Sequence, residues 1–353
     1  MDISTLIANL ALDDETDRIY AADDLGEANA AEAILPLMER LAIEPSRKVR
    51  ESIFLALGKI DSPAVPIVVA ALLESDDAFL RNQSVGLLQR KGAAAAPALL
   101  ARMHDADPDV RKFVLDTAAG IASPAVEPVF DAAIRDQDVN VVIAALEYLG
   151  EHRMNRFKPD VEEAFLKGTQ PMLVCAAFAA LLQIGDATSW QCIRQRYPSP
   201  ASVPSWELGW WLRALGDFGA MDEIEVFHDI LLSHDGNVAR DTIDALECFQ
   251  IRHGRVAISE AFWKTLRELL CDTLPSEDKL QLLRVVGGFG APAGIADHLL
   301  ALLDHSDRLT RLGAIEGIKR LGRPDLLARL VSRGGPETDA EVASALAECG
   351  GAS

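Results

Sequence analysis

The sequence is poor in cysteine, in aromatic residues and in long apolar runs. Its five cysteines are dispersed and form no CxxC pair, which argues against a disulfide scaffold and favours a reduced cytoplasm. Aromatic residues make up only 6% of the chain, and Val, Ile, Thr and Tyr are too few for a large sheet. The longest apolar run covers 172–182, whereas a helix across a bilayer needs about 20 apolar residues. Because the N-terminus also lacks a basic signal region, we expect a cytoplasmic protein without membrane association.

Positive charge is also in deficit. The chain has 34 Lys and Arg against 54 Asp and Glu, which gives a formal net charge of −20. Binding to nucleic acid phosphates needs a basic surface, so we expect no nucleic acid partner. Alanine and leucine are abundant instead, and together they account for 100 of the 353 residues. Because both are strong helix formers, the composition predicts an all-α fold.

Prolines recur at a constant spacing in the first half of the chain. Steps of 30 or 31 residues separate Pro36, Pro66, Pro97, Pro128 and Pro159. Glycines placed near the expected ends of short helices give a second ruler of about 32 residues. They are Gly26, Gly58, Gly92, Gly120, Gly150, Gly185, Gly216, Gly288, Gly322 and Gly350. A fixed period of this length is the signature of a repeat protein.

The unit at 107–138 shows how one repeat is built. Asp107 is suited to an N-cap, and Pro108 to the first helical position. Gly120 can stop this helix by taking a left-handed conformation, and Pro124 permits a new start. Each unit is therefore predicted to hold two short antiparallel helices. A pair this small cannot bury its apolar face alone and must stack on its neighbours.

An aspartate four residues before an arginine marks the start of several units. The pairs are Asp14–Arg18, Asp77–Arg81, Asp107–Arg111 and Asp307–Arg311. The aspartate can cap free backbone N–H groups, and the arginine can bridge to an acceptor in its own or the next repeat. Because the same pair recurs in several units, we interpret it as a structural ladder between repeats, not as one functional site.

The D-x-x-x-R pattern, the Ala/Leu positions and the closing glycine resemble the HEAT family, in particular the short bacterial HEAT-like repeats of phycobilisome bilin lyases. The resemblance implies an α-α superhelix, or α-solenoid, of about ten two-helix repeats. It also implies protein–protein binding and only occasionally an enzyme. We predict one continuous solenoid over 1–353, with regular repeats at 1–160, degenerate repeats at 161–300, and regular repeats with a C-terminal cap at 301–353.

The repeat pattern breaks most sharply at 194–216, where three prolines crowd a stretch that also holds three tryptophans. Trp211 falls at a core position of the repeat, whereas Trp210 falls at a variable position and is expected to be partly exposed. Trp206 lies one turn earlier and could share a surface with Trp210. Aromatic anchors are favoured at interfaces, so we take these three residues as candidate partner contacts. The alternative is a repacked junction that needs bulk.

Charge is distributed unevenly along the chain. Residues 1–30 carry eight acids and one base, whereas 308–333 carry seven bases and two acids. The basic run could bind an acidic partner or the acidic end of another copy, or it could be a mixed solvated face. It makes a second candidate contact, represented by Arg308, Arg311, Lys319, Arg320 and Arg323.

Motifs for catalysis are absent from the sequence. It has no HExxH, GxSxG or P-loop pattern, and its only Glu/His neighbours are Glu151 and His152, in the reverse order of the His-Glu dipeptides of HEAT-like di-iron hydroxylases. We therefore predict no catalytic residue, metal, cofactor or small-molecule ligand. The leading hypothesis is a noncatalytic bacterial scaffold or adaptor that binds a protein partner. Two alternatives stay open: a bilin lyase-like or lyase-helper protein, and a regulatory adaptor in a signalling or chemotaxis pathway.

Overall fold

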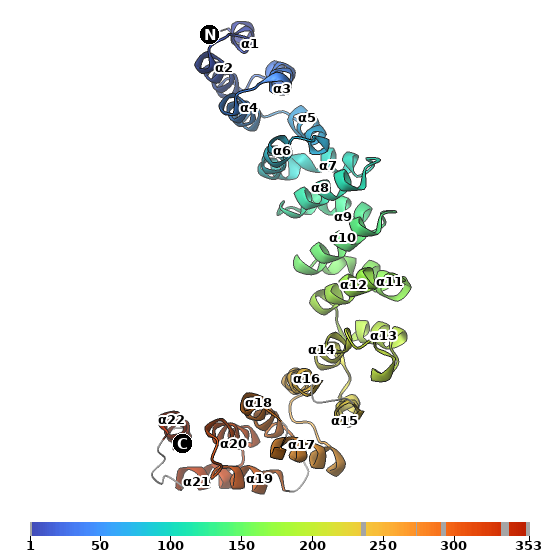
Figure 1. Cartoon of the computed structure of the whole chain (residues 1–353), viewed down its shortest axis with the longest axis vertical. Coiled ribbons are helices and arrows are strands. Elements are labelled where there is room, and N and C mark those ends of the chain that lie inside the picture. The colour runs from blue at the N-terminus through green and yellow to red at the C-terminus, as the bar shows by residue number, and fades with distance from the viewer. Residues whose placement is uncertain (1, 234–237, 273, 291–293, 333–338, 351–353) are drawn as a thin grey trace. The chain divides into compact units, whose positions relative to one another are not determined.

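The computed structural model describes residues 2–233, 238–272, 274–290, 294–332 and 339–350, and their regular structure is helical (Figure 1). Within these ranges ten helix pairs follow one another, with α1 (Ile3–Asn9) before them and α22 (Ala340–Gly350) after them. The first helices of the pairs are α2 (Glu15–Glu27), α4 (Arg47–Lys59), α6 (Ala78–Lys91), α8 (Pro108–Ala119), α10 (Val139–Glu151), α12 (Pro171–Ile184), α14 (Leu208–Phe218), α16 (Ala239–His253), α18 (Ser276–Val286) and α20 (Arg308–Leu321). The second helices are α3 (Ile34–Ile43), α5 (Ala64–Ala70), α7 (Ala96–Arg102), α9 (Glu127–Ala133), α11 (Lys158–Lys167), α13 (Ala187–Arg196), α15 (Ile224–Ser233), α17 (Glu260–Asp272), α19 (Ile295–Leu302) and α21 (Pro324–Ser332). The prediction of an all-α solenoid of about ten two-helix repeats is confirmed.

The chain divides into two compact units. The first unit comprises 1–160 and 169–177, and the second comprises 161–168 and 178–353. In the first unit the first helices stack in chain order, α2 on α4, α4 on α6, α6 on α8 and α8 on α10. In the second unit α14 packs on α16, α16 on α18 and α18 on α20. Each pair thus buries its apolar face against the next pair, as stacked repeats require.

Capping side chains and prolines set where the helices begin. The N-cap side chains of α2, α4, α6, α8, α10 and α20 accept hydrogen bonds from first-turn backbone N–H groups; they are Asp14, Ser46, Asp77, Asp107, Asp138 and Asp307. The evenly spaced prolines occupy the second or third position of α3, α5, α7, α9 and α11. Their missing N–H is harmless there because N–H groups of the first turn have no partner inside the helix.

The regularly spaced glycines do not all end helices. The prediction of a left-handed Gly120 is wrong, because its φ is −79°. A Cβ at this position would lie 2.1 Å from Nε2 of Gln89, so the glycine makes room for a side chain of the preceding repeat. Glycines with positive φ do end α6 and α20, at Gly92 (φ 58°) and Gly322 (φ 61°), and Gly322 has the left-handed conformation.

Glycine at the same position of different repeats also allows first helices to approach closely. A Cβ on Gly26 in α2 would lie 2.7 Å from Cα of Ala56 in α4. A Cβ on Gly216 in α14 would lie 2.6 Å from the carbonyl oxygen of Ala245 in α16. Gly58 in α4 holds the equivalent position, yet a Cβ there would meet nothing within 4 Å. The glycine is therefore required at two of these interfaces and dispensable at the third.

Candidate partner-binding surfaces

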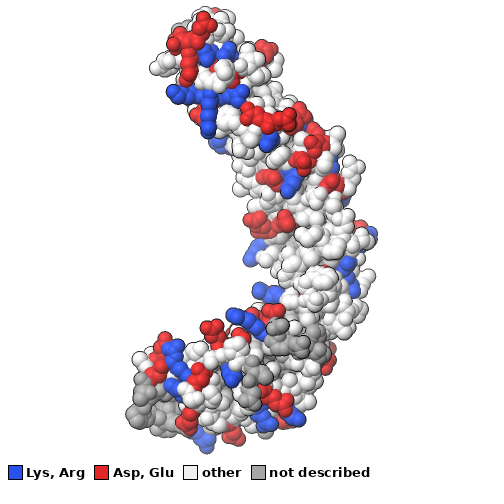
Figure 2. Space-filling model, in the orientation of Figure 1, with Lys and Arg blue, Asp and Glu red and all other residues white. Residues whose placement is uncertain are grey.

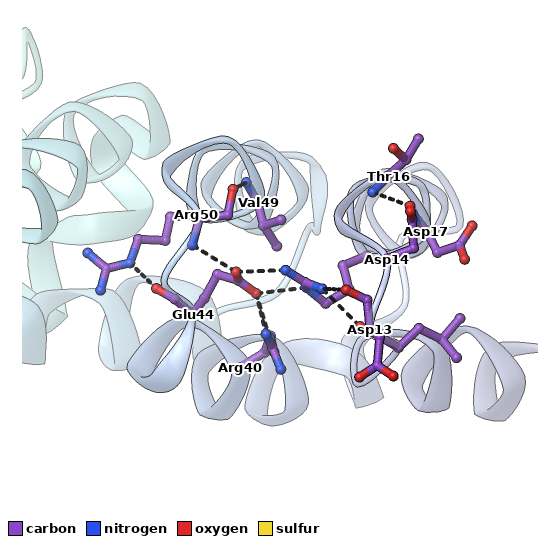
Figure 3. A network of polar contacts seen from close by, with 11 residues as sticks. Asp13, Asp14, Thr16, Asp17, Arg40, Glu44, Val49 and Arg50 are labelled. Carbon is purple, nitrogen blue, oxygen red and sulfur yellow. Dashed lines mark hydrogen bonds and ion pairs between the residues drawn. The ribbon is translucent and has the colours of Figure 1, made fainter.

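The first-unit arginine ladder begins at Arg18, which lies in the first turns of α2 and donates to Glu44. Figure 3 shows the polar network around Glu44. Nη1 of Arg18 donates to the carbonyl oxygens of Leu12 at 2.9 Å and Asp13 at 2.7 Å, which precede the helix. Its Nε and Nη2 donate to the two carboxylate oxygens of Glu44 at 3.0 and 3.1 Å. One guanidinium group thus binds both the turn before α2 and the turn before α4, which is the first helix of the next repeat.

Glu44 is the acceptor at the centre of this network and is fully buried. It also accepts from Nε of Arg40 at 2.6 Å and from the backbone N–H of Ser46 at 2.9 Å. Burial raises the pKa of Glu44, but the hydrogen bonds from Arg18, Ser46 and Arg40 outweigh it, so the pKa lies below its ordinary value. The carboxylate is therefore charged and fully used inside the protein.

The same arrangement returns in other repeats. Arg111 donates to both carboxylate oxygens of Asp136 at 2.7 Å, and to the carbonyl oxygen of Asp105 at 2.8 Å. Arg50 donates to Asp77 at 2.8 Å from the equivalent position. The D-x-x-x-R pattern does not include Arg50, because the N-cap of its helix is a serine.

Arg81 and Arg311 also hold the turns before their own helices, α6 and α20. Arg81 donates to the carbonyl oxygen of Ser75, and its guanidinium lies 5.4 Å from the ring centroid of Phe113. Arg311 donates to the carbonyl oxygens of His305 at 3.0 Å and Ser306 at 3.1 Å. These hydrogen bonds stabilise the turns before α6 and α20, which is the role that a structural ladder implies.

The three tryptophans of the repeat break lie in different environments. Trp211 is 1% exposed, with its ring centroid 5.1 Å from that of the buried Trp190, so it cannot contact a partner in this structure. Trp210 is half-buried and packs edge-to-face on Phe178 with the centroids 6.0 Å apart. Trp206, in the turn before α14, is 68% exposed. Of the three candidates, Trp206 alone presents most of its side chain to solvent.

The basic residues after 307 are largely paired with carboxylates. Their partners are Glu341 for Arg308 (2.6 Å), Glu316 and Glu348 for Lys319 (3.1 and 3.2 Å), Glu247 for Arg320 (2.9 Å) and Asp325 for Arg323 (2.7 Å). Three of these acids lie outside 308–333, so a charge count within that window could not include them. In the second unit, Lys and Arg accordingly lie beside Asp and Glu on the face that Figure 2 shows. Arg333, the last base of the run, lies outside the described residues.

A groove in the second unit brings together residues that the sequence did not single out as a site. It has a volume of about 750 Å³ and is formed by one face of α13, Pro198 after it, the 218–223 segment and the end of α16. We call it the α13–α16 groove. A volume of this size is within the range of ligand-binding clefts in proteins. Its α13 wall overlaps the start of the repeat break, which is the only sequence signal that points to it.

Glu223 organises one side of the groove. Its carboxylate accepts from Nε1 of Trp190 at 2.6 Å, from the backbone N–H of Ala220 at 2.7 Å, and from Nη1 of Arg194. The Arg194 guanidinium also lies 6.0 Å from the Trp190 ring centroid. Arg194 and Glu223 therefore neutralise each other and hold the indole at the groove wall.

Arg252 and His253 form the opposite side, at the end of α16. Arg252 donates to the carbonyl oxygen of Gly219, and its Nη2 lies 2.7 Å from Nε2 of His253. Among the described residues, no carboxylate lies within ion-pair distance of Arg252. Burial lowers the pKa of Arg252 below its ordinary value, although the more distant Asp217 and Glu223 act in the other direction.

The described ranges contain neither a candidate membrane span nor a cluster of metal ligands. None of the helices there combines the length and the apolar character that crossing a bilayer requires. Nor do three or more His, Cys, Asp or Glu side chains of those ranges come together as metal ligands would.

Comparison with protein-family models identifies the family of the repeats. Residues 3–89 and 96–181 match the family model of HEAT repeats. The chain is a HEAT-repeat protein. The match covers the first unit, with its arginine ladder, and ends near the point where the aromatic contacts of the second unit begin. A search of curated proteins finds no match.

Solved structures support the same fold. Kap95p, in a complex with RanGDP, aligns with 98% of this HEAT-repeat chain and 56% of its own, at 12% identity and a TM-score of 0.52. Two further matches have TM-scores too low to carry an argument. They are the CpcE–CpcF complex of phycocyanin lyase from Nostoc sp. PCC7120 (19% identity, 71% of this chain, 94% of that chain, TM-score 0.28) and YibA of E. coli (16% identity, 71% and 93%, TM-score 0.39). Identities this low show the fold alone.

Proposed function

We propose that this HEAT-repeat protein is a noncatalytic scaffold that binds a protein partner through the α13–α16 groove and the exposed Trp206. The observation that carries the proposal is the groove itself, because it combines a large open volume with an indole wall and two guanidinium groups. Clefts lined by aromatic and arginine side chains are where binding energy concentrates in protein interfaces.

The rest of the molecule supports a scaffold role. In the first unit the ladder arginines and their carboxylate partners are used up in contacts within and between repeats. Such groups make a rigid support and leave little charged chemistry for a reaction. Kap95p, a chain of the same fold, binds a protein, RanGDP, which is consistent with this use of the fold. The bilin lyase and signalling-adaptor alternatives remain predictions, because no contact in the described residues favours either one.

A capture experiment tests this function. The full-length chain and two variants, Trp206→Ala and the double variant Gln191→Ala/Gln195→Ala, would be used as bait in extracts of the native cell. The two glutamines line the groove and are exposed, so their removal leaves the core intact. Lys264→Ala, on the exposed face of α17, serves as a control outside the groove.

We expect a protein that the wild-type chain and Lys264→Ala capture equally, and that Trp206→Ala and the double glutamine variant each lose by at least fivefold in quantitative mass spectrometry. Equal capture by all four baits would exclude this surface. Capture of no protein by the wild-type chain would contradict the scaffold function.

A further inference from the structure

The charge of Arg252 distinguishes it from the other arginine of the α13–α16 groove. Arg194 is neutralised by Glu223, whose oxygens also bind Trp190 and Ala220. Arg252 contacts only a carbonyl oxygen, an imidazole nitrogen and the Phe249 ring, whose centroid lies 5.7 Å away. The groove therefore contains one positive charge that no described carboxylate compensates at close range.

Arg252 is exposed at the end of α16, so its guanidinium group is open to an incoming carboxylate. Its planar fork matches a carboxylate in a bidentate geometry, and a ring beneath it limits the entropy lost on binding.

The other residues of the groove wall determine which ligand groups can bind beside the carboxylate. Trp190, Pro198 and Phe218 offer apolar surface, whereas Gln191 and Gln195 offer amide groups that can pair with a peptide backbone. A peptide that places an apolar side chain beside an acidic one uses both kinds of wall.

The remaining charge in the groove selects against polyanions. Asp222 lines the groove and is exposed, and Glu223 lies beside it. A ligand with a single carboxylate can face Arg252 and avoid these acids, whereas a nucleic acid strand would bring its phosphates close to them. The excess of acid over base in the whole chain acts in the same direction.

We propose that the α13–α16 groove recognises a partner segment that carries an Asp or Glu beside an apolar residue, and that Arg252 anchors its carboxylate. This inference rests on the proposed protein-binding function and adds the chemistry of the partner to it.

The experiment uses the full-length chain and a random 12-residue peptide library displayed on phage. Selections would be run on the wild-type chain, on Arg252→Gln, and on Lys264→Gln as a matched loss of an exposed positive charge. We expect wild type and Lys264→Gln to enrich peptides with an acidic residue next to a Leu, Phe or Trp, and Arg252→Gln to lose the acidic preference.

A synthetic peptide from the wild-type selection then serves as the probe, together with a twin in which its acidic residue is replaced by the matching amide. Fluorescence anisotropy should show at least a tenfold weaker affinity for Arg252→Gln, for the amide twin, and for the two combined, because both changes remove the same contact. Arg252→Lys should retain part of the affinity. Since the twin peptide is measured on the wild-type chain, the comparison holds even if Arg252→Gln folds poorly.

Three outcomes would overturn the inference or its basis. Selected peptides without an acidic preference, or an acidic peptide that Arg252→Gln binds as tightly as wild type, would overturn the role of Arg252 and leave the scaffold function in place. Enrichment of no peptide on the wild-type chain would count against the groove as a protein-binding site at all.

Discussion

The two units of this protein stack their helix pairs with different side chains. In the first unit, buried ion pairs such as Arg18–Glu44 and Arg111–Asp136 join the turns of neighbouring repeats. In the second unit, ion pairs between repeats such as Arg194–Glu223 are partly exposed. Buried rings pack between repeats there, among them Phe227–Phe249, with centroids 5.5 Å apart, and Phe262–Phe289 at 6.2 Å. The same two-helix plan thus tolerates either a polar or an aromatic junction.

The difference shows where such a chain can acquire a binding site. A repeated ladder leaves each arginine committed to the fold, since its donors are taken by carbonyls and carboxylates of adjacent turns. Where the ladder is lost, bulky rings keep the helices packed, and a polar group such as Arg252 is left without a carboxylate. We infer that the irregular repeats recognise the partner, whereas the regular repeats form a rigid support.

The largest effect is expected from the aromatic core of the second unit. Trp211→Ala removes a fully buried indole and should lower the free energy of unfolding by about 3–5 kcal/mol. Urea titrations followed by far-UV circular dichroism would measure it. Trp206→Ala is the control, because its indole is mostly exposed. A loss below about 1 kcal/mol for Trp211→Ala would show that the ring does not support this unit.

The ladder of the first unit should be nearly as sensitive. Glu44→Gln leaves the guanidinium groups of Arg18 and Arg40 without their carboxylate and should cost about 3 kcal/mol. All five tryptophans lie at 190–263, so fluorescence reports the second unit whereas circular dichroism reports both. We expect the urea midpoint to fall more by dichroism than by fluorescence. The opposite order would refute the local role of this pair.

Glycine-to-alanine substitutions at one position of the repeat should change the stability of the protein in opposite directions. Gly216→Ala places a Cβ 2.6 Å from the carbonyl oxygen of Ala245 and should cost about 1–3 kcal/mol by forcing α14 and α16 apart. Gly58→Ala meets open space within α4 and should stabilise by about 0.5–1 kcal/mol. Thermal unfolding of the two variants beside wild type would test this. Destabilisation by both would mean that helix geometry, not contact between helices, decides the effect.

The smallest effect is expected from pH. The pKa values of Glu44 and Asp136 are lowered in the folded chain, so the stability they supply is present above the pKa of the unfolded chain and is lost as pH falls through the folded value. The difference in stability between wild type and Glu44→Gln should therefore shrink between pH 7 and pH 3.5. Urea titrations at both pH values would measure it. A constant difference would mean that Glu44 is not stabilising as a charged group.

The sequence predicted the repeat plan because that plan is local. Asp107, Pro108 and Pro124 act on backbone groups within a few residues, so spacing alone places helices α8 and α9. The core position of Trp211 followed in the same way, from alignment with other repeats.

Contacts between repeats were harder to predict. The acids that pair with the basic run, Glu247 and Glu348 among them, lie on other repeats. Arg252 meets Gly219, which is 33 residues earlier in the chain, and this contact exists only because α16 continues to His253 before Gly254 ends it. No sequence motif predicts a groove that is formed by three separate segments.

Hydrogen exchange measured by mass spectrometry on the full-length chain, with and without the selected acidic peptide, tests most directly whether recognition lies in the irregular unit. We expect protection at 187–198, 218–223 and the end of α16 around 252–253, with the first helices of the first unit unchanged. Protection centred on α2 to α10, with none at the groove, would contradict the assignment of recognition to the irregular unit.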